Sequence, residues 1–182
     1  MKKGLVMEGG AMRCMFTAGV TDTLMKADID FDGAIGVSAG AAFGWNYKSR
    51  QIGRVLRYNV KYASDPRLSS WQSWLKTGDL YGADFCYHDL PVKLDIFDTV
   101  AFQKNSIDFW YVATDINNGE AIYHKLILGK EANLQWIRAF SSIPVFAQPV
   151  EIGSRKYWDG GISNSIPIKF FEKLATIRTL SF

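Results

Sequence analysis

Two short apolar runs, each followed by a turn and a helix-like segment, occupy the first fifty residues. The first run, residues 4–7, ends at Glu8-Gly9-Gly10 and precedes apolar residues at near-helical spacing over 13–27. The second run, residues 34–37, precedes a small-residue segment over 39–47 that also has a helical pattern. Strand, helix, strand and helix in this order predict right-handed βαβ units, which bring the carboxyl ends of the strands to one edge of a parallel sheet. We therefore expect an α/β fold.

The second half of the chain predicts further strands and helices. The segments "DFWYVATDI" and "AIYHKLIL" flank Asn117-Asn118-Gly119-Glu120, which is typical of a β-hairpin. Residues 134–140 favour a helix that stops before Pro144, and two short strands are expected around Gly153-Ser154. The final segment, "IKFFEKLATIRTLSF", begins as an amphipathic helix and ends in an apolar stretch with no closing signal. We expect a single domain over 1–182 whose C-terminal part is missing or not contiguous after about residue 173.

Composition excludes several classes of protein. A chain of 182 residues can bury one sizeable core, and its net charge of +3 comes without the Lys/Arg clusters of a nucleic-acid-binding surface. Cys14 and Cys86 form no CxxC pair, which favours two reduced thiols, and the N-terminus lacks the apolar core of a secretory signal. No stretch approaches the ~20 apolar residues of a membrane span. We expect a cytoplasmic protein that binds no nucleic acid, with peripheral contact to a membrane left open.

Gly36-Val37-Ser38-Ala39-Gly40 matches G-x-S-x-G, the pattern of a nucleophilic serine in a strand-to-helix turn. Such a serine has a strained backbone, and glycine two residues away on either side prevents collisions with the turn. The N-terminus of the following helix favours negative charge that develops beside the serine. The alternative is a tight glycine-rich turn with an exposed serine.

The earlier turn, "VMEGGAMRC", also joins a strand to a helix. Its backbone N–H groups could cradle a phosphate, form an oxyanion hole opposite Ser38, or belong to a plain turn. Neither a Walker A motif nor G-x-G-x-x-G is present, so phosphate binding is the weakest of the three. Its place one βαβ unit before the serine favours the oxyanion hole.

The base that would accept the serine proton is hard to find among the two histidines. His88 lies in a predicted loop and His124 on a predicted hairpin strand, and both suit ordinary structural roles. Asp159 follows a predicted strand and precedes two glycines, so we expect it at a strand end, where it is either a general base or a turn-capping residue. Asp115, beside the hairpin turn, is a rival carboxylate to which a structural role comes more naturally.

Three motifs in order resemble the patatin-like phospholipases, most of all their bacterial branch. They are Glu8-Gly9-Gly10-Ala11-Met12-Arg13, then Gly36-Val37-Ser38-Ala39-Gly40, then Asp159-Gly160-Gly161. The similarity continues through "SDPRLSSWQSWLKTGDLYGADF", "YVATDINNGEAIYHK" and "SSIPVFAQPVEIGSRKYWDGGISNSIP", up to about residue 173. The resemblance implies a three-layer α/β/α fold around a mainly parallel sheet. It also implies hydrolysis of acyl esters of phospholipids or other lipids without a metal or other cofactor.

The resemblance also implies a role for each motif. Ser38 would be the nucleophile and Asp159 its base, in a dyad without histidine. Backbone N–H groups of Gly9, Gly10 and Ala11 would hold the oxyanion, and Arg13 would orient this loop or attract a phosphate.

Two residues depart from the family pattern, which usually has glycine in place of Ala11 and Cys14. Alanine retains the N–H group, so we expect an oxyanion hole unless this residue needs a positive φ. The alternatives to a Ser–Asp hydrolase are an esterase that uses His88 or His124, and a non-catalytic lipid-binding protein of the same fold. We expect the aromatic segment 71–87 to be core, with an acyl pocket or bilayer contact as the other options.

Overall fold

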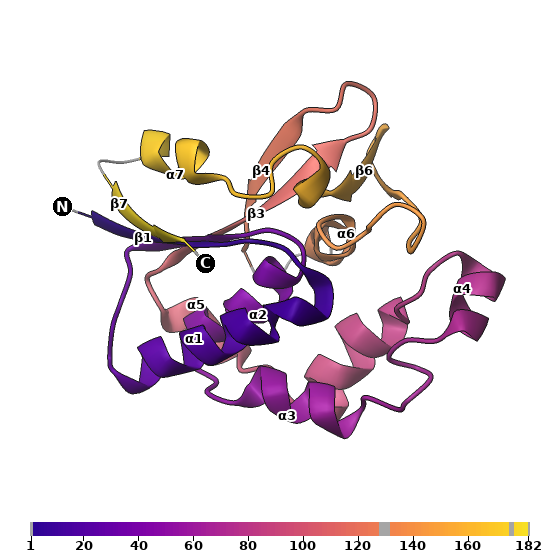
Figure 1. Ribbon diagram of the computed structural model, residues 1–182, viewed down its shortest axis with the longest axis horizontal. Helices are drawn as coiled ribbons and strands as arrows, with labels where there is room; N and C mark the ends of the chain where they lie inside the picture. Colours follow the sequence, from indigo (N-terminus) through magenta and orange to yellow (C-terminus); the bar gives the residue numbers. More distant parts are fainter. Residues whose placement is uncertain (1, 128–131, 175–176, 182) are drawn as a thin grey trace.

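A computed structural model of the protein describes residues 2–127, 132–174 and 177–181 and shows one twisted sheet with helices on both faces (Figure 1). The order of the strands is β5-β6-β3-β2-β1-β7, and β4 pairs with β3 as well. The strands are β1 (Lys2–Met7), β2 (Gly33–Gly36), β3 (Asp108–Asp115), β4 (Ala121–Lys125), β5 (Val150–Ile152), β6 (Arg155–Asp159) and β7 (Ile177–Ser181).

Most of the described strands point the same way. Strand β1 is parallel to β2 and β7, and β2 is parallel to β3, as the βαβ pattern predicts. The expected hairpin is confirmed, because β3 and β4 are antiparallel. Strand β6 is antiparallel to both β3 and β5, so β5 again follows the parallel set. The α/β fold with a mixed, mainly parallel sheet is confirmed.

The helices form the outer layers. They are α1 (Met15–Lys26), α2 (Ala39–Lys48), α3 (Arg54–Lys61), α4 (Trp71–Thr77), α5 (Thr99–Lys104), α6 (Ala132–Ala139) and α7 (Ile168–Leu174), with short 3-10 segments η1 (Ala11–Cys14) and η3 (Gly160–Ile162) and a π-helical segment η2 (Phe85–Leu94). Figure 1 shows α1, α2, α3 and α5 below the sheet and α7 above it. In the described residues, no helix is long and apolar enough to cross a membrane.

Apolar side chains from the strands pack on both faces of the sheet. Leu5 and Met7 pack in one buried cluster with residues of α2, while Val6 between them packs in a second cluster, against which Ile168 and Phe170 of α7 lie. Successive side chains of a strand point to opposite faces, so a strand covered on both faces must be apolar throughout. The unbroken run over 4–7 is apolar for this reason.

Strands β2 and β6 occupy the same edge of β3, one after the other. Gly36 of β2 pairs with Tyr111, and Asp159 of β6 pairs with Ala113. Strand β4 pairs with both Tyr111 and Ala113, and a strand has only two edges, so β2 and β6 must share the edge that β4 leaves open. The end of β2 therefore meets the end of β6.

The aromatic segment is only partly core, contrary to our expectation. No residue of α4 is buried, and Trp71 is 65% exposed. Phe85 is buried, whereas Tyr81 and Tyr87 line a cavity described below. The short helix lies at the far right of Figure 1, away from the sheet, so its apolar residues lie outside the buried core.

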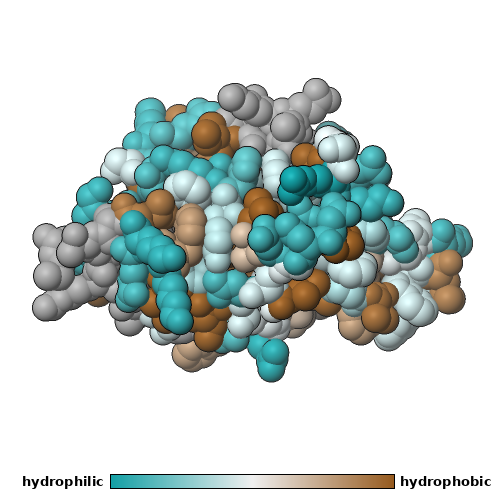
Figure 2. All heavy atoms as spheres, turned by 90° about the horizontal axis from the view of Figure 1, so that it is seen from above, coloured by the Kyte–Doolittle hydropathy of each residue, from teal (hydrophilic) through white to brown (hydrophobic). Residues whose placement is uncertain are grey.

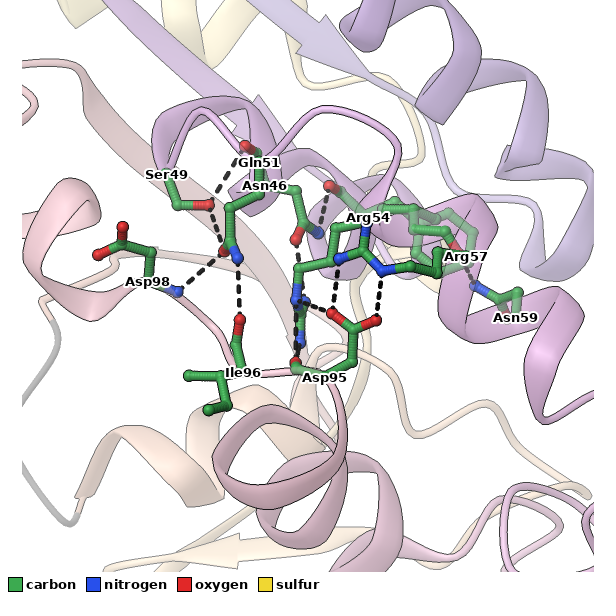
Figure 3. A network of polar contacts seen from close by, with 11 residues as sticks. Asn46, Ser49, Gln51, Arg54, Arg57, Asn59, Asp95, Ile96 and Asp98 are labelled. Atoms are coloured by element: carbon green, nitrogen blue, oxygen red, sulfur yellow. Dashed lines mark hydrogen bonds and ion pairs between the residues drawn. The ribbon is translucent and has the colours of Figure 1, made fainter.

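A buried ion pair fastens α2 and α3 to the segment that precedes α5 (Figure 3). The Arg54 side chain is 2% exposed. It donates hydrogen bonds from Nη1 to Asn46 Oδ1 (2.9 Å) and from Nε to the Asp95 carbonyl oxygen (3.1 Å). The same Nε lies 3.2 Å from the Asp95 carboxylate, with which it forms an ion pair. Arg57 adds two hydrogen bonds to the same carboxylate. Burial lowers the pKa of Arg54, and these partners offset the cost of burying its charge.

We expect Asp95→Ala to lower the free energy of unfolding by about 3–5 kcal/mol, because it leaves the buried guanidinium of Arg54 without its counter-charge. Urea denaturation measures this loss. Asp89→Ala is the matched control, since it removes a carboxylate from the exposed pair with Lys93 and should change stability little. Equal losses in the two variants would contradict the structural role of the buried pair.

Candidate functional site

Ser38 occupies a strained turn between β2 and α2. Its φ and ψ are 53° and −128°, values that L-residues rarely adopt, and its side chain is mostly buried. The two flanking glycines are required sterically: a Cβ on Gly36 would lie 2.5 Å from Ala41 Cα, and one on Gly40 would lie 2.4 Å from the Glu8 carbonyl oxygen. The glycines of the G-x-S-x-G pattern thus allow β1, β2 and α2 to converge on the serine.

Asp159 lies at the end of β6, where the shared edge of β3 brings it to the serine turn. Its Oδ1 accepts a hydrogen bond from the Gly161 N–H at 2.7 Å, whereas its Oδ2 is buried and has no hydrogen-bond partner in the described part of the chain. Burial raises the pKa of this carboxyl, and the pKa-lowering effects of the neighbouring Ser38 hydroxyl and the Gly161 N–H offset the rise only in part. The result is a buried carboxyl beside the serine with one oxygen free to accept a proton.

The loop after β1 forms the opposite wall. A Cβ on Gly9 would lie 2.8 Å from Ser38 Cβ, so the backbone of this loop lies directly against the serine. Among the described residues, the N–H groups of Gly9, Gly10 and Ala11 have no hydrogen-bond acceptor. Unpaired donors in this position suit a developing oxyanion.

Ala11 has a φ of +48°, so this position does adopt the left-handed conformation that glycine favours. Alanine there costs roughly 1 kcal/mol of backbone strain and keeps its N–H. Arg13 folds back, and its Nε lies 3.5 Å from the Gly10 carbonyl oxygen. Cys14, the other departure from the family pattern, is buried in a core cluster, and its Sγ lies 3.4 Å from the Glu8 carbonyl oxygen.

The other candidate bases lie elsewhere. His88 is exposed on η2, with its Nδ1 3.4 Å from Asp89. His124 stacks on Trp136 at 4.6 Å between ring centroids, and burial lowers its pKa. Asp115 is buried beneath the hairpin turn, accepts from the Asn117 N–H and pairs with Arg155 at 2.7 Å. The structure gives these three residues ordinary structural surroundings.

An apolar cavity opens beside the serine. Ser38 forms part of its wall, together with apolar side chains from α2, η2 and the segment after α6, such as Ala42, Leu90 and Ile143. Asp79 and Arg138 lie in the same wall and pair with each other at 3.7 Å. A slot with apolar walls and a reactive group at one end suits an aliphatic chain.

A second, more open hollow lies on the other side of the serine. It is lined by Gly9, Gly10, Ala11, Met12, Arg13, Ser38, Ile143, Asp159, Gly161, Ile162 and Ser165. Its lining includes all six residues to which the family resemblance assigns a role. No group of three or more potential metal ligands occurs in the described residues.

Sequence reasoning missed the cavity wall that the segment after α6 supplies. Ile143, Phe146 and Ala147 line the cavity, yet the sequence predicted only that a helix ends before Pro144. The apolar pair Val145-Phe146 in a loop was the available signal, because exposed apolar loop residues commonly mark binding surfaces.

Comparison with known proteins places these observations in context. The family model for patatin-like phospholipase matches residues 5–171. The chain is 32% identical over 168 residues to the uncharacterized protein YjjU of Escherichia coli (strain K12), an alignment that covers 91% of this chain and 47% of YjjU. The chain therefore spans about half the length of this relative.

We expect Gly40→Ala to destabilise the protein by about 1–3 kcal/mol, because the new methyl group would overlap the backbone of Glu8 and no rotamer can relieve a backbone clash. Gly19→Ala is the matched control: a Cβ on this α1 residue has no atom within 4 Å, so better helix propensity should add about 0.5–1 kcal/mol. Thermal unfolding of both variants measures the difference. A neutral Gly40→Ala would show that the serine turn tolerates a wider separation of α2 from β1.

Proposed function

Because this chain belongs to the patatin-like phospholipase family, we propose that it hydrolyses acyl esters of phospholipids or other lipids, with Ser38 as nucleophile and Asp159 as its base. The observation that carries this proposal is the buried Oδ2 of Asp159, which has no hydrogen-bond partner among the residues that the structure describes and lies beside the strained Ser38 turn. A carboxyl oxygen without a partner is costly to bury, which argues for a functional reason to keep it.

In the first half of the reaction, Ser38 Oγ attacks the ester carbonyl carbon while Asp159 Oδ2 accepts the hydroxyl proton. The resulting oxyanion takes hydrogen bonds from the N–H groups of Gly9, Gly10 and Ala11, each of which typically contributes ~10²–10³ in rate in such sites. Collapse breaks the bond to the leaving alcohol, which takes the proton from Asp159. Water, deprotonated by the same carboxylate, then attacks the acyl-enzyme. The bond from the acyl carbon to Ser38 Oγ breaks, Asp159 returns the proton to this oxygen, and the fatty acid is freed.

The surroundings of Asp159 favour this role. A general base works best when its pKa is near the working pH, and burial raises the pKa of this carboxyl in that direction. The apolar cavity would hold the acyl chain, and the open hollow would hold the leaving alcohol near Arg13. Arg13, folded toward the Gly10 carbonyl, suits orientation of the loop as well as attraction of a phosphate.

A fluorophosphonate probe tests the nucleophile, because serine displaces fluoride from phosphorus and remains covalently labelled. We expect labelling of wild type and none of Ser38→Ala. Asp159→Asn should lower ester hydrolysis by about 10²–10⁴-fold, the usual contribution of a positioned base. Its fold should be at least as stable as wild type near pH 7, because a raised folded pKa means that ionisation of Asp159 destabilises the native state as pH rises.

A double variant, His88→Gln with His124→Gln, serves as the control for the esterase alternative. We expect its turnover to match that of wild type, because neither side chain lies in the wall of the cavity or of the hollow. Loss of turnover in this variant would indicate that a histidine, and not Asp159, is the general base. Absence of probe labelling on folded wild type would favour the non-catalytic lipid-binding alternative, for which the strained Ala11 is the one supporting observation.

The pH dependence of kcat/KM gives an independent prediction. Asp159 must be ionised to accept the proton, so the rate should rise with pH through a single acid limb whose midpoint lies above the ordinary aspartate value of about 3.9. A soluble short-chain ester is the substrate for this measurement. An acid limb with its midpoint near the ordinary aspartate pKa would contradict a buried carboxylate as the base.

A further inference from the structure

Helix α4 presents apolar side chains to solvent instead of to the core. Trp71 and Leu75 are four residues apart and therefore on one face of the helix, and they are 65% and 76% exposed. The helix has seven residues, too few to be stable in isolation, and none of them is buried. Its apolar face thus contributes little to the stability of the fold.

The loop after α6 lies against α4 and extends the same surface. Trp74 donates from its indole nitrogen to the Val145 carbonyl oxygen at 2.5 Å, and the Leu80 N–H donates to Phe146 at 2.8 Å. Val145 is 72% exposed and has a φ of +74°, an unfavourable value for a β-branched residue. Such strain persists where it serves a function. We call Trp71, Leu75, Val145 and Phe146 the apolar rim.

The apolar rim is continuous with the cavity that reaches Ser38. Phe146 belongs to both, since it is partly exposed and also lines the cavity. Tyr81 lines the same cavity and pairs through its backbone with Ser69, two residues before Trp71. A molecule that contacts the apolar rim therefore lies at the entrance to the cavity.

The chemistry of the apolar rim favours a lipid surface over a protein partner. Its four side chains cannot supply the roughly 800 Å² per partner that a stable protein interface buries. Tryptophan beside aliphatic residues is typical of side chains that lie at a membrane–water interface. The only charged residue in the α4 sequence is Lys76, and Val145-Phe146-Ala147 has none, so the surface suits anionic headgroups. Figure 2 shows hydrophobic atoms at the right end of the molecule, where α4 lies in Figure 1.

We propose that the apolar rim inserts into the interfacial layer of a lipid bilayer, with Lys76 at the headgroups. Insertion would place the entrance of the cavity against the acyl chains, so that one chain could enter it without crossing water. This benefit to the reaction rests on the proposed function, whereas binding to the bilayer is a separate property that can be measured without turnover.

Co-sedimentation with vesicles of phosphatidylcholine and phosphatidylglycerol tests the proposal with the full chain. We expect Trp71→Ser with Leu75→Ser to weaken vesicle binding by about tenfold or more, since burial of one large apolar side chain is typically equivalent to about that factor. The matched control is Leu56→Ser with Val60→Ser, another exposed apolar pair four residues apart, on α3. This control should bind vesicles as wild type does.

Activity assays separate this proposal from the proposed function. The Trp71/Leu75 double variant should hydrolyse a soluble short-chain ester at the wild-type rate and vesicle-borne lipid more slowly, and Ser38→Ala should bind vesicles normally. If wild type hydrolyses no ester but the double variant still loses vesicle binding, the proposed function is wrong and the proposal that the apolar rim binds a bilayer is supported.

Three results would overturn the proposal that the apolar rim binds a bilayer. The first is that the Trp71/Leu75 variant binds vesicles as tightly as wild type. The second is that the α3 control loses as much vesicle binding as this variant. The third is that wild type forms a dimer in solution and the Trp71/Leu75 variant is a monomer. The last result would make a second copy of the chain the occupant of this surface.

Discussion

The candidate site depends on the backbone pairing of β3 with two strands along one edge. Strand β2 covers the first half of this edge and β6 covers the second, in opposite directions. Their ends must therefore meet, and the serine turn after β2 faces the aspartate at the end of β6. No local preference of either motif could produce this contact, because it depends on the register of eight residues in a third strand.

Close backbone contact completes the site on its other side. Gly9 and Gly40 allow the loop after β1 and the start of α2 to approach the serine turn more closely than any side chain would permit. In the same loop, N–H groups have no acceptor among the described residues, and Ala11 has a positive φ. Alanine thus keeps the donor that an oxyanion hole needs, at the cost of strain that glycine would avoid.

The position of the cavity links the site to the outer surface. Its walls come from α2, η2 and the loop after α6, which are far apart in the sequence. The same loop accepts a hydrogen bond from Trp74 of α4 at the Val145 carbonyl oxygen. Aromatic residues that read as core in the sequence divide into three groups: Phe85 is buried, Tyr81 and Tyr87 line the cavity, and Trp71 is exposed. Helical spacing predicted that Trp71 and Leu75 share a face, but not what that face contacts.

The sequence by itself determined the elements with strong local signals: the βαβ beginning, the hairpin at Asn117-Asn118-Gly119-Glu120, and glycine-flanked turns that single out Ser38 and Asp159. These depend on backbone conformations that only certain residues adopt, so the residue types reveal them. Only the tertiary structure decided that β2 and β6 share an edge, that Asp159 Oδ2 has no partner in the described part of the chain, and that Trp71 lies outside the core. Each of these depends on which atoms of distant segments lie next to one another in the folded chain. Contacts between distant segments leave no local pattern in the sequence.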